Sequence, residues 1–346
     1  MGNSSFEEHK ITNPWERYLL TSYLLIVLLS SLIGDTIILI ASVRYNAVKL
    51  NKFLVIVMQH IAVCDLLLAI SFIFPTIVSL IWDRWIFATV GGSIRYLVYS
   101  ACARSNNILV CVLTTSKLLI LKFPLRTRNW DENKGHCVCF LAWFVTIAVA
   151  GIFHFSSGYR YEFDYIYYAV SGYVTSKTAD KFNSAVNVIS YIVPMFTIIF
   201  STALILHHLL RARKISQRVG GTLRWQGMVT VAATATVFSV SIIPGTVLYF
   251  LFMIKGGEIL SFSMFVRVSR VSYFMSALNI MSNFYIYSLT VLSFRKFIKL
   301  KVSLFMEKLT HCLPAQKVGP DPTRSDNKPQ CDTLPVTVEA TGSLCT

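Results

Sequence analysis

The stretch "SNFYIYSLTVLSFRKF", residues 282–297, decides the fold of this chain. It is apolar and aromatic, contains Asn283, Tyr285 and Tyr287, and then changes into the basic pair Arg295-Lys296. An apolar run that stops at a cluster of bases is typical of a membrane-spanning segment reaching the membrane surface. Polar side chains inside such a run indicate a hydrated interior lined by protein, because lipid offers them no partner.

The rest of the 346-residue chain repeats this pattern. Hydrophobic residues make up 54% and charged residues only 14%, whereas soluble domains carry roughly 25% charged residues. We therefore predict an all-α membrane protein, a seven-transmembrane helix bundle, with an outer tail at 1–18, the bundle and an amphipathic eighth helix at 19–306, and a disordered cytoplasmic tail at 307–346. The predicted spans are 19–43, 53–81, 94–121, 137–155, 184–208, 226–253 and 268–291.

Lysine and arginine set the orientation of the spans. They concentrate in the links after spans one, three and five and beyond span seven, while the alternate links are poorer in bases. The positive-inside rule then places the amino terminus outside and the carboxyl terminus in the cytoplasm. This also explains the net charge of +15 without a nucleic-acid partner. Asn3 begins a glycosylation triplet on the outer side, although such triplets also arise by chance.

The segment "FRKFIKLKVSLF", residues 294–305, predicts an amphipathic helix lying on the inner leaflet. Cys312, just beyond it, is either a palmitoylation site or a free thiol. The eight cysteines show no metal-type cluster, so we expect no metal site of this kind. We also see no combination of nucleophile and base that would indicate an enzyme.

Several predicted spans contain polar residues where burial in lipid is costly. Asp35 and Asp65 lie in spans one and two, and span three carries Arg95, Tyr99, Cys102 and Asn106 at helical spacing. Span seven carries Asn279 and Asn283, four residues apart. These faces either converge on a hydrated seam inside the bundle or form hydrogen bonds that only hold the helices together.

Together these residues identify a family. Over residues 19 to about 306, the chain resembles a rhodopsin-like (class A) G-protein-coupled receptor. The resemblance rests on an ordered set of motifs: Gly34-Asp35, Asp65 in "IAVCDLLLA", Trp85 and Phe87, Trp143, Pro194, Pro244, Asn283 and Tyr287 in "NFYIY", and "SFRKF" at the start of the eighth helix. Phe284 stands where the family has proline.

Other positions depart from the family pattern. Ser116-Lys117-Leu118 replaces Asp-Arg-Tyr, and Ser241-Ile242-Ile243-Pro244 replaces the family's Cys-Trp-x-Pro motif, so the aromatic switch residue is absent. Gly91 stands where the family has cysteine, and 156–183 contains no cysteine, so the family's outer disulfide cannot form. Ala277 replaces the retinal-binding lysine of opsins, and Tyr99 replaces the aspartate of monoamine receptors. An opsin and a monoamine receptor are therefore disfavoured.

The resemblance implies a plasma-membrane receptor for a small molecule or a short peptide. Its implied partners are a heterotrimeric G protein, membrane lipids, receptor kinases and arrestin. An allosteric Na⁺ is the one candidate cofactor. Two alternatives stay open: a transporter or channel that uses the same carboxylates, and a receptor-like decoy that binds ligand without activating a G protein.

The expected site residues form three groups. The ligand pocket is predicted to contain Arg95, Tyr99, Arg270 and Tyr273; Arg95, Arg267 and Arg270 favour a ligand with an anionic group, unless the last two only reach into the lipid headgroups. The sodium and water network is predicted to contain Asp35, Asp65, Asn106, Asn279 and Asn283. The activation switch is predicted to contain Ser116, Lys117, Pro244 and Tyr287, with Arg224 facing Lys117 where the family often has an acid.

Overall fold

In the computed structural model, the described residues are 10–44, 51–155, 159–174, 177–216, 222–255, 262–290, 294–296, 298–299 and 303. The first compact unit ends at Leu300, and of the second unit only Ser303 is described. Asn3 and Cys312 lie outside the described residues. Residues 294–296 and 298–299, in the predicted eighth helix, are helical.

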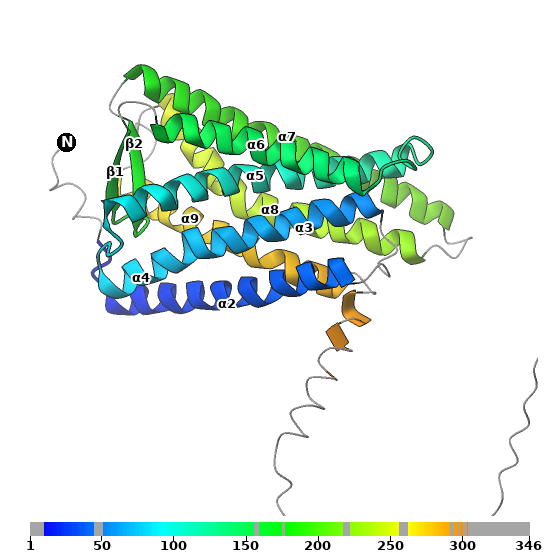
Figure 1. Ribbon diagram of the computed structural model, residues 1–346, viewed down its shortest axis with the longest axis horizontal. Coiled ribbons are helices and arrows are strands. Elements are labelled where there is room, and N and C mark those ends of the chain that lie inside the picture. Colours follow the sequence, from blue (N-terminus) through cyan, green and yellow to red (C-terminus); the bar gives the residue numbers. More distant parts are fainter. Residues whose placement is uncertain are drawn as a thin grey trace, which may run out of the picture. The chain divides into compact units, whose positions relative to one another are not determined.

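Long helices account for almost all of the described chain (Figure 1). They are α2 (Pro14–Arg44), α3 (Lys52–Leu68), η1 (Ala69–Ile73), α4 (Phe74–Trp82), α5 (Ala88–Lys122), α6 (Glu132–Phe155), α7 (Lys177–Ser216), α8 (Thr222–Lys255) and α9 (Phe262–Thr290). Each predicted span falls inside one helix or, for 53–81, inside the continuous α3-η1-α4 segment; only residue 291 lies outside the described chain. The helices extend beyond the predicted apolar runs because their ends continue into polar residues.

The outer surface of the bundle suits a membrane. Within the described residues, five helical segments are long and apolar enough to cross one. Large apolar side chains such as Phe140, Phe144, Phe196 and Phe200 are exposed on α6 and α7. Such a surface would be a liability in water, but in a bilayer it faces lipid tails.

A π-helical turn interrupts the second span. The segment η1 ends at Ile73, two residues before Pro75, which has no backbone N–H to continue the α-helical hydrogen-bond pattern. The hydroxyl of Thr76 donates to the Phe72 carbonyl at 2.7 Å. The ring of Phe72 packs against the rings of Tyr99 and Tyr273, with centroids 5.2 and 4.7 Å away. The irregular turn thus belongs to the interior of the bundle.

A β-hairpin covers one end of the bundle (Figure 1). Strands β1 (Tyr159–Asp164) and β2 (Ala169–Val174) pair antiparallel, with Asp164 opposite Ala169. We call this end the hairpin end, and the opposite end, which carries the link 123–131 between α5 and α6, the far end. The arginines of the predicted pocket hold the hairpin without a disulfide: Arg95 donates to the Val170 carbonyl at 3.1 Å, and Arg270 donates to the Ile166 carbonyl at 3.2 Å.

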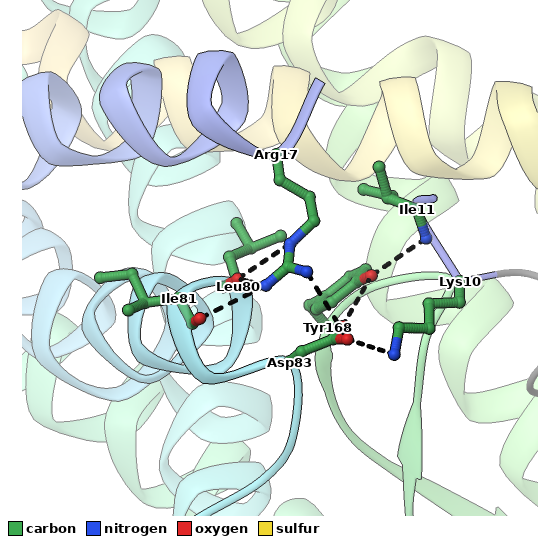
Figure 2. Close-up of polar contacts among 7 residues, drawn as sticks. All are labelled: Lys10, Ile11, Arg17, Leu80, Ile81, Asp83 and Tyr168. Carbon is green, nitrogen blue, oxygen red and sulfur yellow. Dashed lines mark hydrogen bonds and ion pairs between the residues drawn. The ribbon is translucent and has the colours of Figure 1, made fainter. Parts of the chain in front are cut away.

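The amino-terminal segment is fastened to the same end (Figure 2). Asp83 forms an ion pair with Lys10 and lies 3.5 Å from an Arg17 nitrogen. The hydroxyl of Tyr168 accepts from the Ile11 N–H at 3.0 Å and donates to Asp83 at 3.4 Å. We call these five residues the amino-terminal clasp. The hydrogen bond that Lys10 donates to Asp83 raises the pKa of Lys10, and burial raises the pKa of Tyr168 to about 12.

Candidate functional site

A cavity of about 460 Å³ lies between the helices beneath the hairpin. Its walls come from α3, η1, α5, α7, α8 and α9, and the hairpin contributes Tyr167 and Ser171. The lining combines aromatic rings with hydroxyl and amide groups; among the described residues that line it, none is an aspartate or a glutamate. The polar members include Tyr96, Tyr99, Arg104, Asn106, Asn107, Asn187, Tyr191, Ser272, Tyr273 and Asn279.

The four predicted pocket residues take different positions. Tyr99 and Tyr273 line the cavity. Arg95 is not part of its lining, but it donates to the Tyr273 hydroxyl at 3.1 Å and lies 5.9 Å from the Tyr99 ring centroid. Arg270 lies away from the cavity wall and contacts Glu16 at 3.5 Å. The third base of the predicted group, Arg267, is exposed.

A different arginine lines the cavity. Arg104, on α5, is only 5% exposed. It donates to the carbonyl and the hydroxyl of Ser100, and its Nη2 donates to Asn187 Oδ1 at 2.8 Å. Sequence reasoning missed Arg104 because it lies off the stripe of Arg95, Tyr99, Cys102 and Asn106. The signal was present, since a charge within an apolar run requires a reason.

The predicted sodium and water residues converge below the cavity. Asp65 is fully buried, and its two carboxylate oxygens accept from Asn106 and Asn283, each at 2.7 Å. Asp35 is also fully buried, accepts from the Ser31 hydroxyl at 2.6 Å and acts electrostatically on Asp65. Asn279 lies one turn from Asn283 on α9 and, like Asn106, lines the cavity. We call these five predicted residues the carboxylate seam.

Several oxygens of this region have no hydrogen-bond partner among the described residues. They are Asp35 Oδ1, Asn106 Oδ1, Asn283 Oδ1 and the Tyr287 hydroxyl. Buried polar atoms are almost always satisfied by protein, water or an ion. Three of these four atoms are acceptors only, so the seam suits a hydrated cation better than an anion.

The predicted switch residues are spread along the bundle. Ser116 is buried and Lys117 half-buried near the end of α5, and Tyr287 is buried on α9. Pro244 is exposed within α8. Arg224 belongs to the first turn of α8, but its side chain lies outside the described residues. The structure therefore places Tyr287 beside the carboxylate seam and does not describe the contact expected between Lys117 and Arg224.

Phe284, which stands where the family pattern has proline, packs against Gly34. A Cβ atom added at Gly34 would lie 2.6 Å from both Cβ and Cγ of Phe284. Real Cβ atoms essentially never approach this closely, so Gly34 leaves the space that the phenyl ring needs. The ring of Phe284 also meets Phe294 at 6.2 Å, beside the basic residues that follow α9.

One family model matches the chain, over residues 34–292. It describes a "7 transmembrane receptor (rhodopsin family)". The matched range contains the cavity lining, the hairpin and the carboxylate seam. It also contains every predicted switch residue.

Proposed function

The chain belongs to the rhodopsin family of seven-transmembrane receptors, and we propose that it couples the binding of a small molecule or a short peptide to activation of a heterotrimeric G protein. As a member of this family it is a multi-pass membrane protein and a signal-transducing receptor. The ligand, the G protein and the plasma-membrane location are part of the proposal.

The observation that carries this function is the cavity. Its volume of about 460 Å³ falls within the range of roughly 300–1,000 Å³ typical of small-molecule sites. Tyrosine and phenylalanine rings provide apolar contact area, while hydroxyl and amide groups provide directional contacts. The predicted residues Tyr99 and Tyr273 line the cavity. Arg95 lies outside the lining and donates a hydrogen bond to the Tyr273 hydroxyl, which helps to position that side chain.

The proposed orientation places the hairpin end outside the cell. The link 123–131 at the far end carries the exposed bases Arg126 and Arg128, and Lys134 follows it. Bases near the ends of membrane helices favour the cytoplasmic side. A ligand would then enter beneath the hairpin, and a G protein would bind the far end. Receptor kinases and arrestin are proposed as further cytoplasmic partners because the tail is rich in serine and threonine.

The carboxylate seam connects the two ends in this proposal. Asn106 and Asn279 line the cavity, and Asn106 shares Asp65 with Asn283. A ligand that contacts α5 and α9 differently in two states would shift the population between them. We propose that the unpaired oxygens of Asp35, Asn106 and Asn283 hold a Na⁺ ion, which would balance the charge of the two carboxylates.

A cell-based screen tests this function against its two alternatives. Cells that carry the receptor should show a second-messenger response to members of a small-molecule and peptide library, and cells without it should not. Ion flux through the purified protein in proteoliposomes, without such a response, would favour the transporter or channel. Saturable ligand binding that never recruits a G protein would instead favour the decoy.

A further inference from the structure

The guanidinium group of Arg104 has more donors than its neighbours can accept. An arginine side chain carries five N–H donors, and three hydrogen bonds use at most three of them. The Nε–H has no partner among the described residues although it is fully enclosed. Both acceptor residues, Ser100 and Asn187, are neutral.

Among the residues that the structure describes, no acidic side chain forms an ion pair with Arg104. The ion pairs found there involve Asp83, Glu132 and Glu16. Asp65 accepts hydrogen bonds from Asn106 and Asn283. Asp180 lies on α7, seven residues before Asn187. At roughly 1.5 Å per residue, its backbone lies about 10 Å along the helix from that of Asn187, toward the hairpin end. A buried charge without a counter-ion is costly, which indicates that something else completes the site.

We propose that Arg104 binds the carboxylate of an anionic ligand inside the cavity. This inference rests on the proposed function, since it names the ligand class of the same cavity. Hydrogen bonds between a guanidinium group and a carboxylate are charge-assisted, and an enclosed site strengthens them. The carboxylate would accept from an Nη donor that the bonds to Ser100 and Asn187 leave unused, while these two residues hold the side chain in place.

The remaining wall restricts the rest of the ligand. Tyr99, Phe72 and Tyr273 form an aromatic group on the α5, η1 and α9 sides of the cavity. Hydroxyl and amide groups such as those of Asn107, Ser272 and Ser276 complete the lining. A small aromatic carboxylic acid fits this combination of groups. A neutral amide of the same shape would leave the charge of Arg104 unbalanced.

A purely structural role for Arg104 makes a different prediction. In that case its hydrogen bonds to Ser100 and Asn187, and its position 5.8 Å from the Phe153 ring, would serve only to join α5, α6 and α7. Removing the guanidinium group would then lower the unfolding temperature of the ligand-free receptor. It would also leave no difference between acids and amides as ligands.

The test uses phenylacetate and its neutral analogue phenylacetamide with the full-length receptor in nanodiscs. Binding is measured by ligand-observed NMR titration, and unfolding temperature is measured in parallel. The wild type should bind phenylacetate about tenfold more tightly than phenylacetamide, because hydrogen bonds to charged groups are the stronger ones. Arg104→Gln should abolish this preference without lowering the ligand-free unfolding temperature, and Arg104→Lys should retain part of it. The exposed Arg84→Gln removes a charge at the hairpin end and serves as the matched control.

Each outcome decides the proposal. Equal binding of acid and amide by the wild type, binding of neither, or an unchanged preference in Arg104→Gln would overturn it. If Arg104→Gln does not fold, an undiminished preference in Arg104→Lys overturns it equally. These measurements involve no G protein, so a receptor that prefers acids but never activates a G protein would contradict only the proposed function.

Discussion

At the scale of single residues, Gly34 and Phe284 are matched in size. The glycine on α2 leaves room for the phenyl ring on α9, at the position where the rhodopsin-family pattern has proline. Phe284 stands in place of a proline that would bend the helix, and its ring instead packs between α2 and α9. The family motif therefore loses its proline, while its other two residues, Asn283 and Tyr287, are buried.

We predict that Gly34→Ala destabilises the receptor. The added methyl group would collide with Phe284, and overpacking of this kind typically costs about 1–3 kcal/mol. Thermal unfolding in nanodiscs measures the effect, and Phe284→Ala in the same chain should restore most of the loss. Gly151→Ala is the matched control, because nothing lies within 4 Å of a Cβ atom there. Equal stability of the two alanine variants would contradict the close packing.

We predict that Asp65→Asn changes signalling without changing surface expression. An asparagine cannot accept from both Asn106 and Asn283 as the carboxylate does, because one of its two polar atoms is a donor. The dependence of basal G-protein activation on sodium concentration should weaken or vanish. Asp131→Asn, at an exposed position of the far end, should behave as wild type. Normal signalling at every sodium concentration and pH would leave the seam a purely structural feature.

At the scale of elements, noncovalent contacts fix the hairpin where the family pattern has a disulfide. Arg95 and Arg270 donate hydrogen bonds to hairpin carbonyls, and within the amino-terminal clasp Tyr168 of the hairpin donates to Asp83, the residue after α4. Gly92 permits the close approach of β2 to α5, since a Cβ atom there would lie 2.9 Å from Val170. Such contacts open far more readily than a covalent bond, so we expect the hairpin to open locally.

We predict that Asp83→Asn loosens the clasp. Its ion pairs with Lys10 and Arg17 are partly exposed and contribute about 0–1 kcal/mol each, so opening should become severalfold more frequent. Hydrogen exchange should accelerate in residues 10–17 and 159–174 and stay unchanged in α6. The exposed neighbour Arg84→Gln is the control. Unchanged exchange in both segments would show that the clasp does not fasten the hairpin.

The clasp should also depend on pH in one direction. Asp83 raises the pKa of Lys10 above its ordinary value of 10.5. The contribution of this pair is therefore fully present at neutral pH and is lost as the pH rises through the folded-state pKa. The Asp83→Asn variant should lack this alkaline loss of protection.

The elements differ in how far the sequence predicts them. The membrane helices follow from apolar runs because a bilayer requires about 20 apolar residues per span. The hairpin was not predicted, although its first strand, YRYEFD at 159–164, alternates aromatic and charged residues as a strand does. Its second strand, AVSGYV at 169–174, lacks such alternation. The seam was predictable from its buried acids and amides. Arg104 was not singled out, because it lies nine residues from Arg95, about 180° around the helix at 3.6 residues per turn. Only the packing of α7 places Asn187 beside it.

At the scale of the whole molecule, we propose that the far end sets the resting activity. Lys117 replaces the third-span arginine of the family pattern, and Arg224 stands where an acid is common. Two cations at these positions would repel each other, although solvent at the membrane surface reduces the effect to roughly 1 kcal/mol or less. Even this amount changes a small active population severalfold.

We predict that Arg224→Glu lowers basal second-messenger output at an unchanged surface level. The new carboxylate would attract Lys117 and so hold the far ends of α5 and α8 together. Arg211→Glu, at an exposed position on α7, makes the same change of charge elsewhere and is the control. Unchanged or higher output from Arg224→Glu would count against an electrostatic latch.

The central claim is that this chain is a receptor whose far end activates a G protein. The most direct measurement is nucleotide exchange on purified heterotrimeric G proteins of each main class, mixed with the receptor in nanodiscs. We predict that the receptor accelerates exchange on at least one class above empty nanodiscs, and that a ligand from the screen changes this rate. A folded receptor that binds such a ligand but leaves exchange at the rate of empty nanodiscs for every class would contradict the account.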